Sequence, residues 1–486
     1  MNLSDLLSSF SESFQISGTI DCDINGISSD SRKVNPGNLF IALRGGQEQD
    51  RHEFVEHAVQ RGAIALVVEK PLKIKVPQVI VRNSRTCLSH IAQQWYGDPA
   101  DKLVNIGITG TNGKTTTAYL LYRLLELLGS PCGYLGTLGL YTDDFARSIG
   151  NTTPESDVLH RSLKSMVDAG KKFSSLEVSS HALSLGRIDR IKFSVGVFTN
   201  FSRDHIDYHQ SMNAYFEAKA RLFQQLDKDS VAVLNADDEK SELLASRTAA
   251  QIVNYGRSSS ADFCLEEFEV KVDGMKLKIN TPQGCYILDT KLTGAFNCEN
   301  ILAVLSVGHV LGFALKDMCE IISSIEVVPG RFEKIDIGQD YHIVVDYAHT
   351  PDALKKLLAS IRDITKGRIL CVFGCGGDRD SGKRAPMGKV VDEFSSIAWI
   401  TSDNPRTEDP QKIIDEIIEG VSLSGQHRVE LDRSKAIQGA LAEARPGDWV
   451  VIAGKGHETE QVLADGTVEF DDRLIAKNFA SNSISN

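Results

Sequence analysis

A short loop around residue 110 has the residue types and spacing of a phosphate-binding site. The segment "VNIGITGTNGKTTTAYLLYRLLELLG", residues 104–129, holds an apolar strand-like run, a Gly/Thr/Asn loop and then a helical pattern. The backbone amides of such a loop, together with the N-terminus of the following helix, attract anions. Lys114 can reach the β- and γ-phosphates of a nucleotide, and the Thr115 hydroxyl can ligate Mg²⁺. The residues expected to hold the phosphates are Gly110, Thr111, Asn112, Gly113, Lys114, Thr115 and Thr116.

This loop does not by itself decide the class of enzyme. It departs from the strict pattern G-x-x-x-x-G-K-[ST], because Ile108 stands where the first glycine belongs. GTPases, kinases and ligases all use loops of this kind. A GTPase would also carry an N-K-x-D segment, which this sequence lacks. Other motifs must separate the remaining classes.

Polar residues follow two more strand-like runs, at positions where a metal ion could be held. Glu177 ends the run in "SSLEVSSHAL", and His205 follows the run in "FTNFSRDHIDYH". The carboxyl ends of parallel strands meet at one edge of a sheet, so both side chains are expected beside the phosphate loop. There they could meet a second Mg²⁺, or each could serve only as a hydrogen-bonding group. Lys219, on the helix that follows, has by itself the pattern of a solvated helix lysine.

The elements that must position these residues alternate along the whole chain. Apolar runs of strand length, polar loops and helical patterns follow one another, which is typical of α/β proteins. The segment "MKLKINTPQGCYILDTKL" alternates in polarity and turns at Pro-Gln-Gly, which predicts a hairpin. A chain of 486 residues is too long for one compact core. We expect three α/β domains, spanning residues 1–98, 99–330 and 331–486.

Composition excludes several other classes of protein. The net charge of −12 argues against a general nucleic-acid binder, which would normally be basic. No apolar run approaches the roughly 18 residues that a membrane span requires. The nine cysteines are scattered, and the first residues lack a secretory signal pattern, so we expect a cytoplasmic chain with reduced thiols. We also expect a monomer.

Seven motifs in one order give the chain a specific resemblance. They are "TGTNGKTTT", "NTTP", "EVSSHAL", "NFSRDHIDYH", "GAFNCEN", "PGRFE" and "DYAHTPDAL", and they extend over most of the chain. Together they resemble the Mur ligase family, whose members are ATP-dependent amide-forming enzymes of peptidoglycan synthesis. The resemblance implies an N-terminal domain for a UDP-sugar substrate, a central P-loop domain for ATP and a C-terminal Rossmann-like domain.

The resemblance also implies roles for residues around the nucleotide. Lys219 matches a lysine that the family carbamylates to N6-carboxylysine, and its carbamate helps to hold Mg²⁺. Thr115, Glu177 and His205 match the other groups near the metal, and the implied catalytic residues are Lys114, Lys219, Glu177 and His205. The implied nucleotide contacts outside the loop are Asn297, Arg331 and Asp346.

Two groups of residues match the family's contacts to the UDP-sugar substrate. Matches at the UDP end are Ser29, Ser31, Gly46, Gln47 and Glu48. Matches at the muramoyl-dipeptide end are Asn151, Thr152, Thr153, Ser179 and Arg187. Leu185 departs from the pattern, because some members carry a substrate-contacting glutamine at this position. This departure removes one contact and leaves the assignment in place.

Three loops of the third region are expected to bind the incoming amino acid. Each follows a strand-like run, so the loops can converge at the carboxyl edge of a parallel sheet. An arginine can fork onto the distal carboxylate of diaminopimelate, and an acidic side chain can take its distal ammonium. "DNPR" is the family's marker for meso-diaminopimelate, whereas lysine-adding relatives carry a less basic sequence. The expected contacts are Arg379, Asp403, Asn404, Pro405, Arg406, Gly454 and Glu458.

The implied reaction joins meso-diaminopimelate to the D-glutamate γ-carboxylate of UDP-N-acetylmuramoyl-L-alanyl-D-glutamate. ATP is the co-substrate, Mg²⁺ is the cofactor, and an acyl phosphate is the intermediate. Two other ligases remain as alternatives, namely an L-lysine-adding relative and folylpolyglutamate synthetase. An alternative from a different class is a P-loop nucleotide-binding protein without ligase activity.

Overall fold

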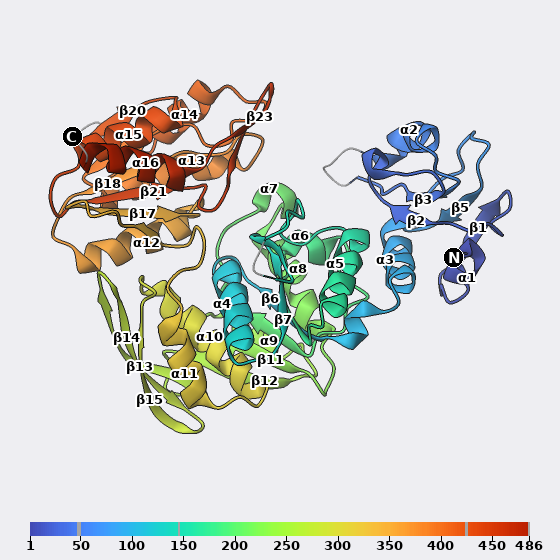
Figure 1. The fold of residues 1–486 in the computed structure, drawn as a ribbon, viewed down its shortest axis with the longest axis horizontal. Helices are drawn as coiled ribbons and strands as arrows, with labels where there is room; N and C mark the ends of the chain where they lie inside the picture. The colour runs from blue at the N-terminus through green and yellow to red at the C-terminus, as the bar shows by residue number, and fades with distance from the viewer. Residues whose placement is uncertain (46–49, 144–145, 423–425, 485–486) are drawn as a thin grey trace.

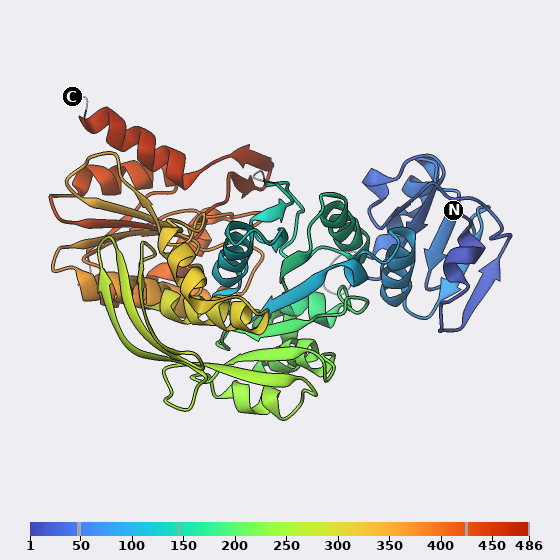
Figure 2. The same cartoon turned by 60° about the horizontal axis from the view of Figure 1, so that its bottom comes forward.

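The chain forms three α/β bodies, each built around its own sheet. The computed structural model describes residues 1–45, 50–143, 146–422 and 426–484. Figures 1 and 2 show the N-terminal body at one end of the molecule and the central and C-terminal bodies packed side by side. The expected three-domain α/β fold is confirmed. The boundaries at 98 and 331 stay predictions; they fall between the sheets, whose strands begin at Phe14, Val104 and Glu333.

The N-terminal body is a five-stranded sheet in the order β1-β5-β4-β3-β2, in which β1 alone runs antiparallel to its neighbour. β3 and β4 are buried along their whole length, as expected for apolar strands covered on both faces. The elements are α1 (Leu3–Leu7), β1 (Phe14–Ser17), β2 (Gly26–Ser28), η1 (Ser31–Lys33), β3 (Asn38–Ile41), η2 (Arg51–Phe54), α2 (Val55–Gln60), β4 (Ala65–Val68), β5 (Gln78–Val81), α3 (Ser84–Trp95) and η3 (Pro99–Lys102).

The central body is a ten-stranded sheet in the order β15-β14-β13-β12-β11-β10-β6-β9-β7-β8, parallel from β13 to β7. The predicted hairpin is present as β14 and β15. The strands are β6 (Val104–Thr109), β7 (Cys132–Gly136), β8 (Gly139–Tyr141), β9 (Phe173–Glu177), β10 (Val195–Phe198), β11 (Val231–Asn235), β12 (Gln251–Gly256), β13 (Phe263–Lys271), β14 (Gly274–Thr281) and β15 (Gly284–Thr290). The helices are α4 (Lys114–Leu127), α5 (Ser156–Asp168), α6 (Ser180–Ser184), α7 (Ile206–His209), α8 (Met212–Gln224), α9 (Lys240–Ala245), α10 (Phe296–Val310) and α11 (Leu315–Ser324).

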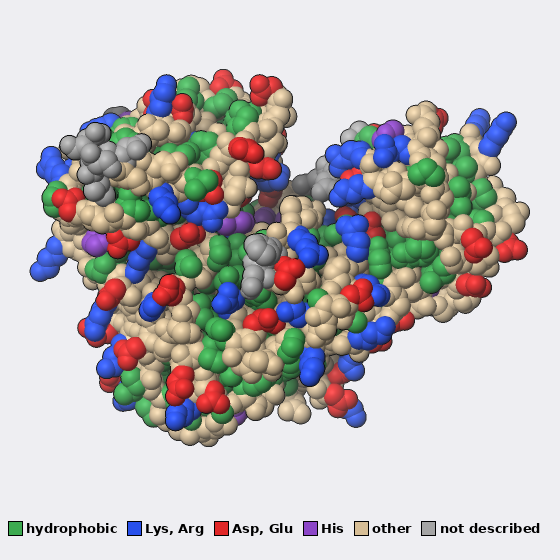
Figure 3. All heavy atoms as spheres, viewed as in Figure 1, with side chains coloured by type: hydrophobic (Ala, Val, Ile, Leu, Met, Phe, Trp, Pro, Cys, Tyr) green, Lys and Arg blue, Asp and Glu red, His purple; other side chains and the backbone are tan. Residues whose placement is uncertain are grey.

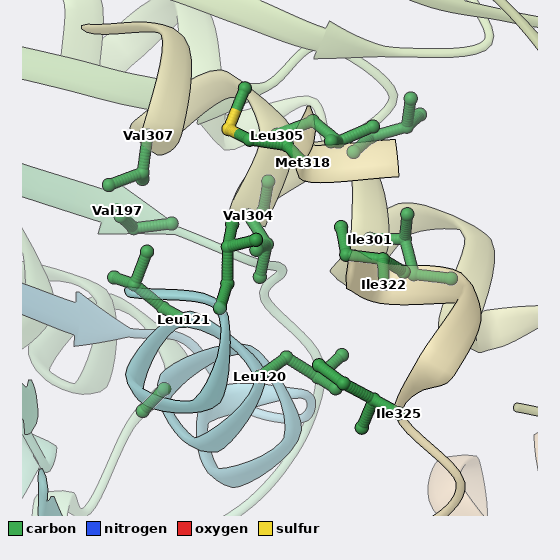
Figure 4. Close-up of a cluster of buried hydrophobic side chains, with 14 of the residues drawn as sticks. Leu120, Leu121, Val197, Ile301, Val304, Leu305, Val307, Met318, Ile322 and Ile325 are labelled. Atoms are coloured by element: carbon green, nitrogen blue, oxygen red, sulfur yellow. The ribbon is translucent and has the colours of Figure 1, made fainter. Parts of the chain in front are cut away.

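The helix that follows the phosphate loop is fixed by a large apolar core. Leu120 and Leu121 of α4 meet Val304 of α10 and Met318 of α11 in one buried cluster, which Figure 4 shows. α10 is buried along most of its length and is apolar nearly all round, as expected for a helix enclosed by protein. Each fully buried leucine or valine contributes about 1.5–3 kcal/mol. This packing holds the N-terminus of α4, and so the phosphate loop, in place.

The C-terminal body is a six-stranded sheet in the order β16-β17-β21-β18-β19-β20, in which only β16 is antiparallel to its neighbour. Separate apolar cores fill its two faces. The elements are β16 (Glu333–Ile335), β17 (His342–Asp346), α12 (Pro351–Ile364), β18 (Ile369–Phe373), η4 (Ser381–Lys383), α13 (Arg384–Phe394), β19 (Ile397–Ile400), α14 (Pro410–Ile418), β20 (His427–Val429), α15 (Arg433–Glu443), β21 (Trp449–Ala453), β22 (Glu460–Leu463), β23 (Gly466–Glu469) and α16 (Asp472–Ile484).

Parallel pairing places the chemistry-bearing loops at strand ends. In the central sheet, β6, β9 and β10 are neighbours and end at the phosphate loop, at Glu177 and before Asn200. In the C-terminal sheet, β18, β19 and β21 end at the three loops proposed for the amino acid. Among the residues that the structure describes, no helix has both the length and the apolar character needed to cross a bilayer.

Candidate active site

One cavity of about 670 Å³ contains most of the predicted residues. It lies where the central and C-terminal bodies meet, and it also takes Arg85 from the N-terminal body. Figure 3 shows the surface hollowed between these bodies, with histidine side chains visible in the hollow. The volume is in the range of small-molecule sites. Predicted residues on its wall are Thr111–Thr116, Asn151–Thr153, Glu177, Ser179, Arg187, His205, Lys219, Arg331, Asp346 and Arg379.

The phosphate loop connects β6 to α4 through two glycines with left-handed backbones. Gly110 has φ +152° and Gly113 has φ +85°. A Cβ at Gly110 would collide with Thr199 Oγ1, and one at Gly113 would collide with Asn300 Oδ1. Glycine is therefore required at both positions, by conformation and by space. Residues 111–116, which include the first turn of α4, line the cavity, where a helix N-terminus attracts anions. The N–H groups of Thr111 and Asn112 donate to Asn200, at 2.8 and 2.9 Å.

Two lysines converge on the loop from different helices. Lys114 Nζ donates to Gly110 O at 2.9 Å and to Thr111 O at 2.8 Å. Lys219 Nζ, from α8, donates to the same Gly110 O at 2.6 Å. Burial, reinforced by the charge of Lys114, holds the pKa of Lys219 well below its ordinary value. The lysine with a solvated-helix pattern is in fact 1% exposed and faces the phosphate loop.

Glu177 is a fully buried carboxylate at the end of β9. Thr115 Oγ1 donates to its Oε2 at 2.9 Å, and Thr137 donates through its backbone N–H at 2.8 Å and its hydroxyl at 3.1 Å. The Tyr134 hydroxyl also donates to it, and Glu177 in turn raises the pKa of that phenol, next to the larger effect of burial. Charge-assisted donors of this kind stabilise an ionised carboxylate. Glu177 is thus held beside the Thr115 hydroxyl.

His205 lies on the same cavity but in a histidine-rich corner of it. Its backbone is left-handed, with φ +52°, and its ring lies 4.8 Å from that of His181. Burial lowers the pKa of His205 to about 3 and that of His181 to about 4, so both rings are neutral at pH 7. Asp204 lies 3.3 Å from His205 Nε2. Within the described part of the chain, no three His, Cys, Asp or Glu side chains form a ready metal cluster.

Arg331 reaches the phosphate loop from the entry to the C-terminal body. Its Nη2 donates to Thr115 Oγ1 at 2.9 Å, and its guanidinium lies over the Tyr347 ring at 4.3 Å. Its buried Nε has no partner among the described residues, so one donor is left for a ligand. Asp346 accepts 2.7 Å bonds from the amides of Phe332 and Ala348, and burial raises its pKa.

Asn297 and Gly110 are predicted nucleotide contacts that are absent from the cavity wall. The Asn297 side chain donates to Thr293 O at 2.8 Å and accepts from Asn300 at 3.0 Å. The cavity is lined instead by Phe296, Glu299 and Asn300 of the same helix. The role of Asn297 in contacting nucleotide stays a prediction.

Arg187 links Thr153, which is predicted to contact the muramoyl-dipeptide, to a cluster of charged residues at the domain border. It donates to Thr153 O at 2.9 Å and to Glu155 Oε1 at 2.9 Å. Glu155 also accepts two bonds from Arg85, at 2.9 and 3.0 Å, and lies 3.7 Å from Arg51. Burial opposes ionisation of Glu155, but the arginines prevail and its pKa is lowered. Arg187 Nε is buried without a partner in the described structure, so it can serve a ligand.

Ser29 and Ser31, predicted at the UDP end, lie outside the cavity wall, and Ser29 lies at the same border. Ser29 donates through its N–H and its hydroxyl to Asp157 Oδ2 at 2.9 and 3.0 Å, and Arg51 donates to Ser29 O at 2.9 Å. Ser31 Oγ is 3.1 Å from His57 Nδ1. The other predicted UDP contacts, Gly46, Gln47 and Glu48, lie outside the described residues.

The three loops of the C-terminal body do converge, as their strand ends require. Asn404 donates to Glu458 Oε2 at 3.0 Å, and Arg406 donates to Gly377 O at 2.7 Å. A Cβ at Gly454, whose φ is +116°, would lie 2.7 Å from Asp403 Oδ2. Arg406, which directly follows Pro405, has a left-handed backbone, with φ +53°. Arg379, from the first loop, faces the cavity.

Several residues of the site escaped sequence reasoning. Glu155, Tyr347 and Lys455 touch predicted residues, and Arg85 lines the cavity and binds Glu155. "NTTPE" directly precedes α5, so the proximity of Glu155 to Thr153 was a usable signal. For Arg85 and Lys455, no local pattern distinguishes them from surface charges.

The fold and the site together define a nucleotide-dependent α/β enzyme of three domains. Three family models match consecutive parts of the chain: "Mur ligase family, catalytic domain" at 23–96, "Mur ligase middle domain" at 108–308 and "Mur ligase, glutamate ligase domain" at 330–456. The chain therefore belongs to the Mur ligase family and is an ATP-dependent ligase.

Curated relatives and solved structures agree with this family. UDP-N-acetylmuramoyl-L-alanyl-D-glutamate–2,6-diaminopimelate ligase of Geobacillus kaustophilus is 44% identical over 462 residues, 94% of each chain. The Bacillus cereus enzyme of that name is 40% identical over 470 residues, 96% of this chain and 95% of that one. A solved structure of a ligase of that name is 32% identical with TM-score 0.68, covering 100% of this chain and 99% of that one. MurF ligase of Thermotoga maritima in complex with ADP, 17% identical with TM-score 0.67 over 94% of this chain and 98% of that one, shares the fold.

Proposed function

We propose that this ligase joins meso-diaminopimelate to the D-glutamate γ-carboxylate of UDP-N-acetylmuramoyl-L-alanyl-D-glutamate, with ATP as co-substrate. The observation that carries the proposal is the composition of one cavity wall. The phosphate loop, the Asn151–Thr153 segment with Arg187, and Arg379 of the amino-acid loops all face the same space. Three reactants can therefore meet there. The substrates named for relatives that match 94% of the chain or more support the same reaction.

The reaction needs an activated carboxylate, because a free carboxylate has no adequate leaving group. The γ-carboxylate attacks the γ-phosphorus of ATP, which gives an acyl phosphate and ADP. The free amine of the amino acid then attacks the acyl carbon, and the resulting tetrahedral intermediate expels phosphate and loses a proton. Lys114 and Arg331 hold positive charge where the transferred phosphoryl group collects negative charge. Alignment of the reactants lowers the activation free energy by about 7–11 kcal/mol.

The residues around Thr115 fit Mg²⁺ once Lys219 carries a carbamate. Mg²⁺ prefers oxygen ligands and keeps substrate phosphates in its shell. Thr115 Oγ1 and Glu177 Oε2 lie 2.9 Å apart and offer two such oxygens, whereas the ammonium of an unmodified Lys219 would repel the ion. Thr115, Glu177, His205 and carbamylated Lys219 would hold it. Bound there, Mg²⁺ neutralises phosphate charge.

The environment of Lys219 favours its proposed carbamylation. Only a neutral amine attacks CO₂, and burial beside Lys114 lowers the pKa of Lys219 well below its ordinary value. The neutral amine would add to the carbon of CO₂ and lose one proton, which gives a carbamate with one negative charge. The modification also removes the repulsion between two lysines that share Gly110 O.

The converged loops supply complementary charges for the distal end of diaminopimelate. Arg379, which lies on the cavity wall, and Arg406, which does not, offer guanidinium groups to the distal carboxylate. Glu458 offers a carboxylate to the distal ammonium. L-Lysine lacks the distal carboxylate, so the arginines would favour meso-diaminopimelate. We place the reaction in the cytoplasm, which the nine free cysteines support.

Phosphate release from ATP tests the proposal directly. The assay compares meso-diaminopimelate, L-lysine and L-ornithine as acceptors, each with and without the UDP-muramoyl dipeptide. We expect release that needs both the dipeptide and an acceptor, with meso-diaminopimelate strongly preferred. Preference for L-lysine would reassign the acceptor. Release that needs no acceptor would contradict the proposed ligation.

A further inference from the structure

A fully buried lysine lies directly behind the loops proposed for the amino acid. Lys455 follows β21 and is 0% exposed. Its Nζ donates to Asn404 Oδ1 at 3.0 Å and to Glu458 Oε2 at 2.9 Å. Lysine is almost never fully buried unless it is paired, and these two hydrogen bonds compensate the ammonium for its loss of water. It is absent from the wall of the large cavity.

Lys455 fixes which way the Asn404 amide points. Asn404 Oδ1 accepts from Lys455 Nζ and also from the backbone N–H of Val462, at 3.0 Å. Its Nδ2 is therefore turned to Glu458 Oε2, at 3.0 Å. A flipped amide would set its N–H groups against two donors. The cost of leaving such buried groups unpaired selects a single orientation.

Lys455 and Asn404 together hold one oxygen of the Glu458 carboxylate. Both donate to Oε2, while Oε1 has no hydrogen bond within the described structure. The Glu458 side chain is 30% exposed, so it can be approached from solvent. Arg406 is held in the same half-occupied way, because its Nη1 donates to Gly377 O at 2.7 Å. In the part of the chain that the structure describes, each of the two charged groups is hydrogen-bonded at one end and has no partner at the other.

We propose that Lys455 is a positioning residue for recognition of the distal ammonium of the acceptor. It rests on the proposed function of these loops and acts through Glu458. By pinning Oε2, Lys455 leaves Oε1 as the oxygen that meets the ammonium of the amino acid. Lys455 touches neither the distal carboxylate nor the reacting amine. Loss of Lys455 should weaken recognition of the distal ammonium and leave recognition of the distal carboxylate unchanged.

Two acceptors separate this role from a general effect on the loops. 2-Aminopimelate keeps the reacting amino-acid end and the distal carboxylate of diaminopimelate but lacks the distal ammonium. In Lys455→Met we expect kcat/KM for meso-diaminopimelate to fall tenfold or more, as for loss of a charge-assisted hydrogen bond. The value for 2-aminopimelate and the KM for ATP should stay within about twofold. An equal fall for both acceptors would show a structural role and overturn the proposal.

A double-mutant cycle with Glu458→Gln tests whether Lys455 acts through that carboxylate. We expect the double variant to be no worse than Glu458→Gln alone, because both changes remove the same contact. If the losses in kcat/KM of the two single variants multiply in the double variant, the proposal is overturned. Thermal unfolding is measured for each variant, and if Lys455→Met does not fold, Lys455→Gln carries the same comparison.

The same assays distinguish failure of this proposal from failure of the proposed function. If the unsubstituted enzyme does not use meso-diaminopimelate, the proposed function fails. If it does and Lys455→Met is unchanged, only the role of Lys455 fails.

Discussion

Arg331 Nη2 donates a 2.9 Å hydrogen bond to Thr115 Oγ1, so a residue at the entry to the C-terminal body touches the first turn of the phosphate-loop helix. The contact joins residues that are 216 positions apart. It places a guanidinium, backed by the Tyr347 ring, at the point where the phosphate loop opens to the cavity. The phosphate site therefore includes a side chain from the entry to the C-terminal body.

Removing the Arg331 guanidinium should slow the phosphoryl-transfer step. Arg331→Ala is expected to lower kcat by about 10²–10³, the usual loss for one donor that stabilises transition-state charge. Phosphate release at saturating substrates measures it. Arg257→Ala is the matched control, because Arg257 lies over Phe268 and outside the cavity wall. A loss confined to the KM for ATP would assign Arg331 to binding alone.

Lys219→Ala should abolish turnover, and added bicarbonate should fail to restore it, because alanine cannot form a carbamate. Intact-mass measurement of the unsubstituted chain under bicarbonate should show the addition of one CO₂, absent from the variant. Lys228→Ala, at an exposed lysine, serves as the control. A Lys219→Ala enzyme with a near-normal rate would rule out the carbamate role.

Glu155→Gln should weaken use of the UDP-sugar substrate. The change removes the charge that joins Arg85 of the N-terminal body to Arg187 of the central body. Charged hydrogen bonds contribute about 1.5–3 kcal/mol, so the KM for this substrate should rise about tenfold or more, with the KM for ATP unchanged. Glu443→Gln, which breaks the partly exposed pair with Arg428, controls for charge loss. Equal rises in both KM values would contradict this assignment.

Arg406→Ala should raise the KM for meso-diaminopimelate much more than the KM for ATP. The expected rise is on the order of a hundredfold, as for a guanidinium that binds a carboxylate. Initial rates over a range of acceptor concentrations measure it, with Arg428→Ala as the exposed control. An unchanged acceptor KM would remove Arg406 from the amino-acid site.

Acid should destabilise the protein through His160. This side chain is 0% exposed, both ring nitrogens lack partners within the described residues, and burial lowers its pKa from 6.5 to about 4. The unfolded chain therefore binds the proton first as the pH falls, and stability is lost between about pH 6.5 and pH 4, by on the order of 3 kcal/mol. Denaturant unfolding of His160→Leu should show a flatter pH dependence over that interval. An unchanged slope would contradict the prediction.

The phosphate loop and the strand-end loops were predictable, because their signals are local. Gly113, Lys114 and Thr115 are consecutive, and parallel pairing places the loops after Glu177 and after β10 at one edge of the sheet. The three-domain α/β fold followed from the alternation of apolar runs and from family motifs. The hairpin of β14 and β15 followed from its alternation and turn residues.

Long-range contacts decided the rest. Lys219 has the sequence of a solvated lysine, and only the packing of α8 beneath the phosphate loop buries it against Gly110 O, 109 residues away. Glu155 meets Arg85 across 70 residues, and Lys455 meets Asn404 across 51. Side-chain periodicity reports which face of an element is apolar, but not which distant charge will meet it. The sequence by itself determined the elements, the phosphate loop and the order of motifs; the tertiary structure decided which charges are buried together, because burial and pairing arise only when separate elements pack.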